Sequence, residues 1–374
     1  MIKVMTVFGT RPEAIKMAPV VKALQAAPER FEPIVVVTGQ HREMLDQVLR
    51  LFDITPDVDL DIMSSNQTLA QITSRVLTQL DPILEEYQPD WVLVQGDTTT
   101  AMAASMAAFY REIKVGHIEA GLRTHDKYKP FPEEINRRIT SVIADLHFAP
   151  TEWAADNLRH EGYPEDRIVV TGNTVIDAIQ SVVTMPFDPI GRFPEEVIQT
   201  DKRIITVTAH RRENFGQGIL SICAAIRTLA SERDDIHIVY PVHLNPNVQE
   251  PVYRELGDLP NVTLLPPLDY QPLVWLMQHS FLILTDSGGI QEEAPGLGKP
   301  VLVLRETTER PEGIEAGTVR LVGIDEHLIV TTAQMLISDA DVYEQMASVS
   351  NPYGDGTAST QILVKLGSDT LGKD

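Results

Sequence analysis

Three carboxylates in the first half of the chain occupy positions suited to proton transfer. Asp97 follows the apolar run Trp91–Gln95. Glu119 follows the run Val115–Ile118, and Glu133 opens a helical pattern. Clustered carboxylates repel each other, so the pKa of one of them can rise well above the usual value of about 4. Because acids with separated pKa values can act as general acid and general base, these residues predict acid–base chemistry.

Each acid also has a purely structural explanation. Asp97 or its neighbour Thr98 could cap the helix that follows. Glu133 and Glu134 lie in the first turn of a helix, where the helix dipole favours acidic residues whatever the function. We assign Glu134 to this structural role. We assign Glu133 to function because it accompanies the other two acids.

The sequence does not indicate a metal or an organic cofactor. His117 and Glu119 would face the same way on a strand, which could suggest a metal site. No third and fourth ligand follows at a suitable spacing, so we predict no metal. The chain has neither a Gly-x-Gly-x-x-Gly fingerprint nor a P-loop, and nicotinamide or ATP chemistry is therefore not expected.

Basic residues after two other strands suit an anionic ligand. Arg11 and Lys16 lie at the start of the first predicted helix, where phosphate or sugar oxygens can bind. The alternative is that both pair at the surface with Glu13 or a similar residue. His210 follows a strand in the second half and precedes two arginines, and a guanidinium binds phosphate through two parallel hydrogen bonds. The alternative there is an exposed loop in which one arginine pairs with Glu213.

A second anion site is predicted after the strand that ends at Thr285. Ser287, Gly288 and Gly289 stand at a strand-to-helix junction, where exposed backbone N–H groups and a hydroxyl can bind a diphosphate. Glu293 lies in the first turns of the following helix and could accept both hydroxyls of a ribose.

Parallel sheets must position these residues, because short β-branched runs alternate with helical patterns. Ligands of such sheets lie at the carboxyl ends of the strands. Strands are predicted at Lys3–Phe8, Pro33–Thr38, Trp91–Gln95, Val115–Ile118, His147–Ala149, Ile168–Thr171, Arg203–Thr208, His237–Tyr240, Val262–Leu265, Phe281–Thr285, Pro300–Leu304 and Val319–Val322. Helices are predicted at Pro12–Ala27, Leu69–Tyr87, Thr98–Tyr110, Thr151–His160, Gly218–Glu232, Pro272–His279 and His327–Ile337.

The predicted fold class is α/β, with two doubly wound Rossmann-like domains facing a cleft. The segment Met185–Thr200 holds three prolines and a glycine and interrupts the alternation, so it should connect the two halves. The N-terminal domain is predicted to span residues 1–184 and the C-terminal domain residues 185–356. The helix at 357–374 should pack back on the first domain.

Composition excludes several classes of partner. The formal charge is −22, from 31 basic and 53 acidic residues, which argues against nucleic acid. No apolar run approaches the roughly 20 residues that span a bilayer, and the N-terminus has no signal-peptide pattern. Cys223 is the only cysteine, so an internal disulfide is impossible and a buried apolar role is expected. These features indicate a cytoplasmic enzyme.

Nine motifs taken together resemble the bacterial non-hydrolysing UDP-N-acetylglucosamine 2-epimerases. They span residues 9 to 356 and read GTRPEAIKMAP, VQGDTTT, GHIEAGLRT, FPEEINRR, TAHRREN, YPVHLNP, LTDSGGIQEEAP, TTERPE and NPYGDG. The resemblance implies a GT-B-like fold whose second domain holds most of the nucleotide. It implies reversible inversion of C2 between UDP-N-acetylglucosamine and UDP-N-acetylmannosamine, by anti elimination of UDP to 2-acetamidoglucal and syn return of UDP.

The resemblance also assigns roles residue by residue. The catalytic positions are Asp97, Glu119, Glu133 and His210, with His210 near the phosphates. The substrate-binding positions are Arg11, Lys16, Ser287, Gly288, Gly289, Glu293 and Arg310. Leu268 and Leu273 stand where the family recognises the base, and Leu273 replaces a phenylalanine of some members. A second UDP-N-acetylglucosamine is implied at an allosteric site that includes Gln40, Glu43, Glu133 and His243, and the family implies a homodimer.

Other activities stay open from the sequence alone. The same chemistry could act on a modified UDP-sugar such as a UDP-diacetamido-uronic acid. A hydrolysing epimerase would release UDP and free N-acetylmannosamine. A GT-B glycosyltransferase needs an acceptor and leaves the three acids unexplained, and a UDP-sugar sensor without turnover would not need them.

Overall fold

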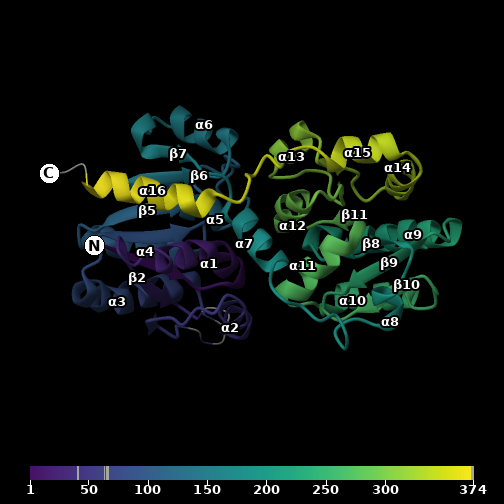
Figure 1. The fold of residues 1–374 in the computed structure, drawn as a ribbon, viewed down its shortest axis with the longest axis horizontal. Helices are drawn as coiled ribbons and strands as arrows, with labels where there is room; N and C mark the ends of the chain where they lie inside the picture. Colours follow the sequence, from purple (N-terminus) through teal and green to yellow (C-terminus); the bar gives the residue numbers. More distant parts are fainter. Residues whose placement is uncertain (40–41, 63, 65–66, 372–374) are drawn as a thin grey trace. The chain divides into compact units, whose positions relative to one another are not determined.

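The computed structural model describes residues 1–39, 42–62, 64 and 67–371. The chain divides into two compact units (Figure 1). Unit 1 comprises Met1–Ala178 together with the segment from Tyr353 onward, and unit 2 comprises Ile179–Pro352. The chain therefore crosses between units twice, once within helix α7 (Thr174–Val183) and once at Tyr353. The proline-containing segment Met185–Thr200 lies in unit 2, after the first crossing.

Unit 1 contains a parallel seven-stranded sheet in the order β3-β2-β1-β4-β5-β6-β7. Its strands are β1 (Ile2–Phe8), β2 (Phe31–Val37), β3 (Val58–Asp59), β4 (Trp91–Gln95), β5 (Lys114–Ile118), β6 (Leu146–Ala149) and β7 (Ile168–Val170). Six of these strands confirm the runs predicted in the first half of the sequence. The two-residue strand β3 pairs with β2 at the edge of the sheet and is too short for its pattern to be recognised.

The helices of unit 1 cover both faces of this sheet. They are α1 (Arg11–Gln25), α2 (Arg42–Leu51), α3 (Leu69–Tyr87), α4 (Thr99–Tyr110), α5 (Glu133–Ile143), α6 (Glu152–His160), the 3-10 turn η1 (Glu165–Arg167), the first part of α7, and α16 (Ala358–Leu371). Helix α16 packs beside α1, and Figure 1 shows it lying across the front of the sheet. Asp177 fixes the start of α16 by accepting hydrogen bonds from Ala358 N (3.3 Å) and Ser359 N (2.8 Å).

Unit 2 contains a parallel six-stranded sheet in the order β10-β9-β8-β11-β12-β13. Its strands, all of which were predicted, are β8 (Arg203–Thr208), β9 (Ile236–Pro241), β10 (Val262–Leu265), β11 (Ser280–Thr285), β12 (Val301–Val303) and β13 (Val319–Leu321). Its helices are α8 (Glu195–Ile198), η2 (Arg212–Asn214), α9 (Gln217–Glu232), α10 (Pro246–Leu256), α11 (Tyr270–His279), α12 (Gly288–Glu293), η3 (Pro295–Leu297), α13 (Pro311–Ala316), α14 (Glu326–Ser338) and α15 (Ala340–Ala347).

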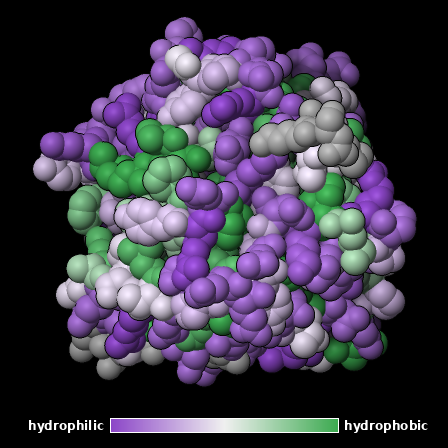
Figure 2. All heavy atoms as spheres, turned by 90° about the vertical axis from the view of Figure 1, so that its left-hand side faces the viewer, coloured by the Kyte–Doolittle hydropathy of each residue, from purple (hydrophilic) through white to green (hydrophobic). Residues whose placement is uncertain are grey.

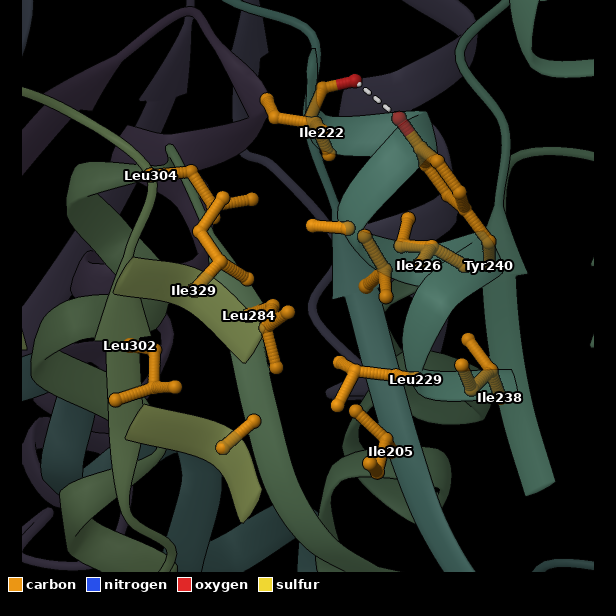
Figure 3. Close-up of a cluster of buried hydrophobic side chains, with 14 of the residues drawn as sticks. Ile205, Ile222, Ile226, Leu229, Ile238, Tyr240, Leu284, Leu302, Leu304 and Ile329 are labelled. Atoms are coloured by element: carbon orange, nitrogen blue, oxygen red, sulfur yellow. Dashed lines mark hydrogen bonds between the residues drawn. The ribbon is translucent and has the colours of Figure 1, made fainter. Parts of the chain in front are cut away.

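The core of unit 2 fixes the loops that carry its polar residues. Ile226 and Leu229 of α9 pack onto Ile205 and Leu284 of the sheet (Figure 3). In the same cluster Tyr240 donates a hydrogen bond from its hydroxyl to the carbonyl of Ala209 at 2.8 Å, the dashed line in Figure 3. The backbone just before His210 is thereby anchored to the core.

Cys223 lies in this core as a small apolar residue, as predicted. It is buried, and burial raises the pKa of its thiol to about 12. A thiol with such a pKa is not a nucleophile near neutral pH.

Both sheets reverse their strand order at one point, between β1 and β4 in unit 1 and between β8 and β11 in unit 2. Such a reversal opens a crevice at the carboxyl ends of the strands, because the connections leave in opposite directions. The loops after these four strands, together with the helices that follow them, contain half of the predicted site residues: Arg11, Lys16, Asp97, His210, Ser287, Gly288, Gly289 and Glu293. Among the described residues, no helix combines the length and the apolar composition needed to cross a bilayer.

Candidate active site

Glu119 directly follows β5, and three of the described residues donate hydrogen bonds to its carboxylate. Lys16 Nζ lies 2.5 Å and Asn173 Nδ2 3.2 Å from its Oε1, and Gln95 Nε2 donates to its Oε2. The side chain is only 6% exposed, and the backbone adopts a positive φ of 64°. Donors directed at both oxygens stabilise the charged form of a carboxylate. Glu119 is therefore arranged as a buried carboxylate with an ammonium beside it.

The alternative in which Lys16 pairs with Glu13 at the surface is wrong, because Lys16 pairs with Glu119. Glu13 is buried, and its Oε2 accepts hydrogen bonds from Gly9 N (3.1 Å) and Thr10 N (2.8 Å). Its Oε1 accepts from Thr98 Oγ1 at 2.6 Å. Burial raises the pKa of Glu13, against the opposite effect of these hydrogen bonds. Glu13 thus joins the loops after β1 and β4 at the point where the strand order reverses.

Asp97 lies in the turn after β4, next to the end of β5. Gly96 makes this turn with a φ of +67° and donates its N–H to the carbonyl of Ile118 at 2.9 Å. Thr98 is the N-cap of α4, because its Oγ1 accepts from Ala101 N at 3.0 Å, so Asp97 is not the cap. The Asp97 carboxylate instead accepts from Arg137 Nη2 at 2.5 Å.

Helix α5 supplies this partner and also carries Glu133. Glu133 is the first residue of α5 and is partly exposed, and Arg137 follows one turn later on the same side of the helix. Asn136 donates to the Asp97 carbonyl at 3.0 Å. Glu134 is buried and accepts from Thr124 N at 3.0 Å, so it organises the preceding loop. This confirms a structural role for Glu134, although it does more than complement the helix dipole.

His117 supports the Gly96 turn through a hydrogen bond. Its Nε2 lies 2.8 Å from the carbonyl oxygen of Gly96, and burial lowers its pKa to about 4. His117 is thus neutral near pH 7 and donates this hydrogen bond from Nε2. Within the ranges that the structure describes, no three His, Cys, Asp or Glu side chains group as they would around a metal.

In unit 2, Asp286 organises the loop that carries His210. Asp286 is fully buried after β11, and its Oδ2 accepts from His210 N (2.8 Å), Arg211 N (2.8 Å) and Asn214 Nδ2 (3.0 Å). His210 Nδ1 lies 3.6 Å from Asp286 Oδ1. The His210 ring also stacks on His243, with 5.4 Å between ring centroids. Asp286 therefore orients both the histidine and the neighbouring arginine.

Two guanidinium groups flank the start of α12. A methyl group placed on Gly288 would lie 3.8 Å from Nη2 of Arg211 and 3.8 Å from Nη2 of Arg310. Arg310 is oriented by the buried carboxylate of Glu292, to which its Nε donates. Ser287 precedes Gly288 and donates its N–H to Thr285 Oγ1 at 2.9 Å. Two guanidiniums beside the backbone N–H groups of a helix start fit a diphosphate.

Arg211 is the arginine of the His-Arg-Arg motif that reaches this position. The side chain of Arg211 makes no ion pair within the described part of the chain. The alternative in which Glu213 pairs with an adjacent arginine is wrong, because Glu213 binds Arg305 Nε at 2.6 Å.

The remaining predicted residues range from buried to exposed positions. Glu293 is buried on α12 beside Tyr270, whose pKa is raised well above its usual value by burial and by the Glu293 charge. Leu268 lies just before α11 and Leu273 lies in its first turn, and both are partly buried. Arg11 begins α1 and makes no ion pair among the described residues, and Glu43 and His243 are exposed. Gln40 lies outside the described residues.

Several residues that shape the two sites were not singled out in the sequence. Gln95 and Asn173 hold Glu119, Arg137 holds Asp97, and Asp286 orients His210. Gln95 could have been recognised from the sequence, because it is a polar residue at the buried end of an otherwise apolar strand. Asp286 could have been recognised in the same way, because it is a charged residue directly after the apolar strand β11.

Comparison with known proteins gives a consistent result. The family model described as UDP-N-acetylglucosamine 2-epimerase matches residues 22–367. The UDP-N-acetylglucosamine 2-epimerase of Salmonella typhimurium is 57% identical over 371 residues, covering 97% of this chain and 98% of that protein. The Neisseria meningitidis UDP-GlcNAc 2-epimerase bound to UDP-GlcNAc is 52% identical, covers all of both chains and has a TM-score of 0.88. The S. aureus MnaA co-structure with UDP is 50% identical, covers 99% and 97% of the two chains and also has a TM-score of 0.88.

These matches extend over nearly the whole chain at identities far above the level at which only the fold is shared. Both parallel-sheet units take part in the structural matches, so the architecture is that of the GT-B-like epimerases. The chain belongs to the bacterial, non-hydrolysing UDP-N-acetylglucosamine 2-epimerase family and is an isomerase.

Proposed function

We propose that this enzyme interconverts UDP-N-acetylglucosamine and UDP-N-acetylmannosamine by anti elimination of UDP to 2-acetamidoglucal and syn re-addition. The observation that carries the proposal is the buried Glu119 carboxylate, fixed by Lys16, Asn173 and Gln95 beside the turn that holds Asp97. The relatives whose structures contain UDP-GlcNAc and UDP support this choice of substrate.

The chemistry explains why such a site is needed. C2 of the sugar is not adjacent to a carbonyl group, so its hydrogen is not acidic. When the C1–O bond to UDP breaks, C1 becomes oxocarbenium-like and the C2–H becomes far more acidic. The electron pair of the C1–O bond leaves with UDP, a carboxylate takes the C2 proton, and a C1–C2 double bond forms. In the return step a proton reaches C2 on the opposite face and UDP re-attaches at C1.

Each unit supplies one part of this reaction under the proposal. Asp97 and Glu119 form the acid–base pair, with Glu133 in a supporting role. Positioned proton transfers of this kind accelerate reactions by about 10² to 10⁴ each. His210, Ser287, Gly288 and Gly289 interact with the diphosphate, together with Arg211 and Arg310. Fixed donors stabilise the charge of departing UDP without reorganising. Glu293 binds the ribose, Leu268 and Leu273 contact the base, and Arg11 contacts the sugar or a phosphate.

Incubation with UDP-N-acetylglucosamine in D₂O, with no nicotinamide added, tests the proposal. We expect deuterium at C2 and a mixture of the gluco and manno epimers, both detected by NMR. Free UDP should stay far below the amount of epimer formed, whereas a hydrolysing enzyme would accumulate it. Saturating substrate with no deuterium at C2 would contradict the proposed function.

We also propose that a second UDP-N-acetylglucosamine binds at Gln40, Glu43, Glu133 and His243. The support is the resemblance of these positions to the family's allosteric site, together with the exposure of Glu43 and His243.

Finally, we propose a homodimer that forms through unit 1. Helices α4 and α5 pack against each other and both run from the carboxyl edge of the parallel sheet back to its amino edge, so their C-terminal ends lie together at the amino edge. Three large apolar side chains are exposed there: Phe109 (59%), Tyr110 (64%) and Val142 (76%). Figure 2 views the side that lies on the left in Figure 1 and shows hydrophobic atoms in several separate groups among hydrophilic ones. Light scattering should give twice the chain mass for the wild type and a single-chain mass for Val142→Asp, and a monomeric wild type would contradict this proposal.

A further inference from the structure

Asn173 contacts Glu119, and its side-chain NH2 group, its side-chain carbonyl and its backbone N–H all form hydrogen bonds. Its Nδ2 donates to Glu119 Oε1 at 3.2 Å. Its Oδ1 accepts from Val175 N at 3.0 Å, at the start of α7. Its backbone N–H donates to the carbonyl of Tyr353 at 2.7 Å. The side chain is buried, so these partners replace water.

These contacts place Asn173 beside both crossings between the units. Helix α7, which begins directly after Asn173, carries the chain out of unit 1. Tyr353 is the first residue of unit 1 after the chain returns. The two segments approach so closely that a methyl group on Gly172 would lie 3.1 Å from the Cα of Gly354. The direction of the Asn173 amide therefore depends on both connections.

The same geometry explains how Asn173 acts on Glu119. The amide and the Lys16 ammonium approach the same carboxylate oxygen, so together they fix the direction of that oxygen as well as its charge. Gln95 fixes the other oxygen from β4. Lys16 reaches Glu119 from α1 and Gln95 reaches it from the sheet. Asn173 is the one of these three donors that adjoins the two inter-unit connections.

We propose that Asn173 is a positioning residue for the reaction, one that holds the Glu119 carboxylate in its ionised, correctly directed state and ties it to the two connections between the units. The inference deepens the proposed function, because it rests on Glu119 taking part in proton transfer at C2. Asn173 is not a catalytic residue itself, since it acts through Glu119.

A purely structural role, in which Asn173 only begins α7, makes different predictions. Asp and Ser accept the backbone N–H of a following helix about as well as Asn does. Asn173→Asp and Asn173→Ser should therefore both preserve the contact with Val175 and the fold. Neither offers the amide N–H to Glu119, and Asp adds a negative charge beside it.

The test is the rate of C2 hydrogen exchange in D₂O, measured across pH for these variants. Loss of one hydrogen bond to a charged group should lower kcat about tenfold in Asn173→Ser, with KM little changed. In Asn173→Asp the like charge disfavours ionised Glu119 and raises its pKa. Activity that requires the carboxylate then appears only at higher pH, so the acidic limb of the profile should move up by about one unit.

Gln361→Ala is the matched control. The exposed Gln361 donates to the carbonyl of Thr171 in the same loop at 3.3 Å and does not contact Glu119. Its kcat and pH profile should equal those of the wild type. Asn173→Asp with an unshifted profile and near wild-type kcat would overturn the inference. Wild-type enzyme without C2 exchange would instead overturn the proposed function, so the two failures are distinguishable.

Discussion

Asp97→Asn is expected to lower the rate of C2 hydrogen exchange by about 10²- to 10⁴-fold, the contribution of one positioned proton transfer. The amide has nearly the same shape as the carboxylate, and its oxygen can still accept from Arg137, which lies 2.5 Å from the carboxylate in the wild type. The amide cannot, however, remove the proton from C2 of the sugar. UDP affinity should stay within about twofold, because the proposed diphosphate ligands belong to unit 2. Exchange is followed by NMR in D₂O and UDP binding by calorimetry.

Asp81→Asn is the matched control for this change. Asp81, like Asp97, pairs with an arginine: Arg111 Nε lies 2.6 Å from its carboxylate. This pair lies at the surface, with Asp81 on α3 and Arg111 just after α4. Its variant should exchange C2 hydrogen at the wild-type rate. If the Asp97→Asn enzyme exchanges C2 hydrogen at a rate within about threefold of the wild-type rate, Asp97 is not a member of the acid–base pair.

The strands could be predicted from the sequence because each one is marked by its own run of apolar residues. Parallel strands buried on both faces read as continuous apolar runs, and all twelve predicted runs are strands. Strand β3 could not be recognised because two residues carry no periodicity. Its pairing with β2 follows from tertiary contacts.

The site was only partly predictable because its supporting contacts join distant segments. Asp97 and Glu119 were recognisable from their positions after strands. Their partners Arg137 and Asn173 lie 40 and 54 residues further along the chain, and nothing in their local sequence indicates the pairing. Similarly, two adjacent arginines follow His210, and only the loop conformation imposed by Asp286 shows that Arg211 points to Gly288.

Lys16→Met is expected to be the most destabilising single substitution at the site. It leaves the Glu119 carboxylate, only 6% exposed, without its ammonium partner 2.5 Å away. Breaking a buried ion pair by removing one partner costs about 3–5 kcal/mol, because the remaining charge is not compensated. For a unit of this size each kcal/mol lowers Tm by about 2–4 °C, so the unfolding transition of unit 1 should shift by about 10 °C. Lys22→Met on the same helix replaces an exposed lysine and should leave Tm nearly unchanged.

The double variant Lys16→Met with Glu119→Gln separates stability from catalysis. Replacing Glu119 by the neutral Gln removes the buried charge that no longer has a partner, and with it the free-energy cost of burying that charge. The double variant should therefore regain most of the lost Tm. It should still fail to exchange C2 hydrogen, because the amide that replaces the carboxylate cannot act as a base. If the double variant unfolds as early as Lys16→Met, the lysine stabilises unit 1 by packing and not by neutralising Glu119. A double variant that regains Tm but does not exchange C2 hydrogen would show that a neutral pair is sufficient for the fold. The charged Glu119 carboxylate would then be needed for the reaction at C2 and not for stability.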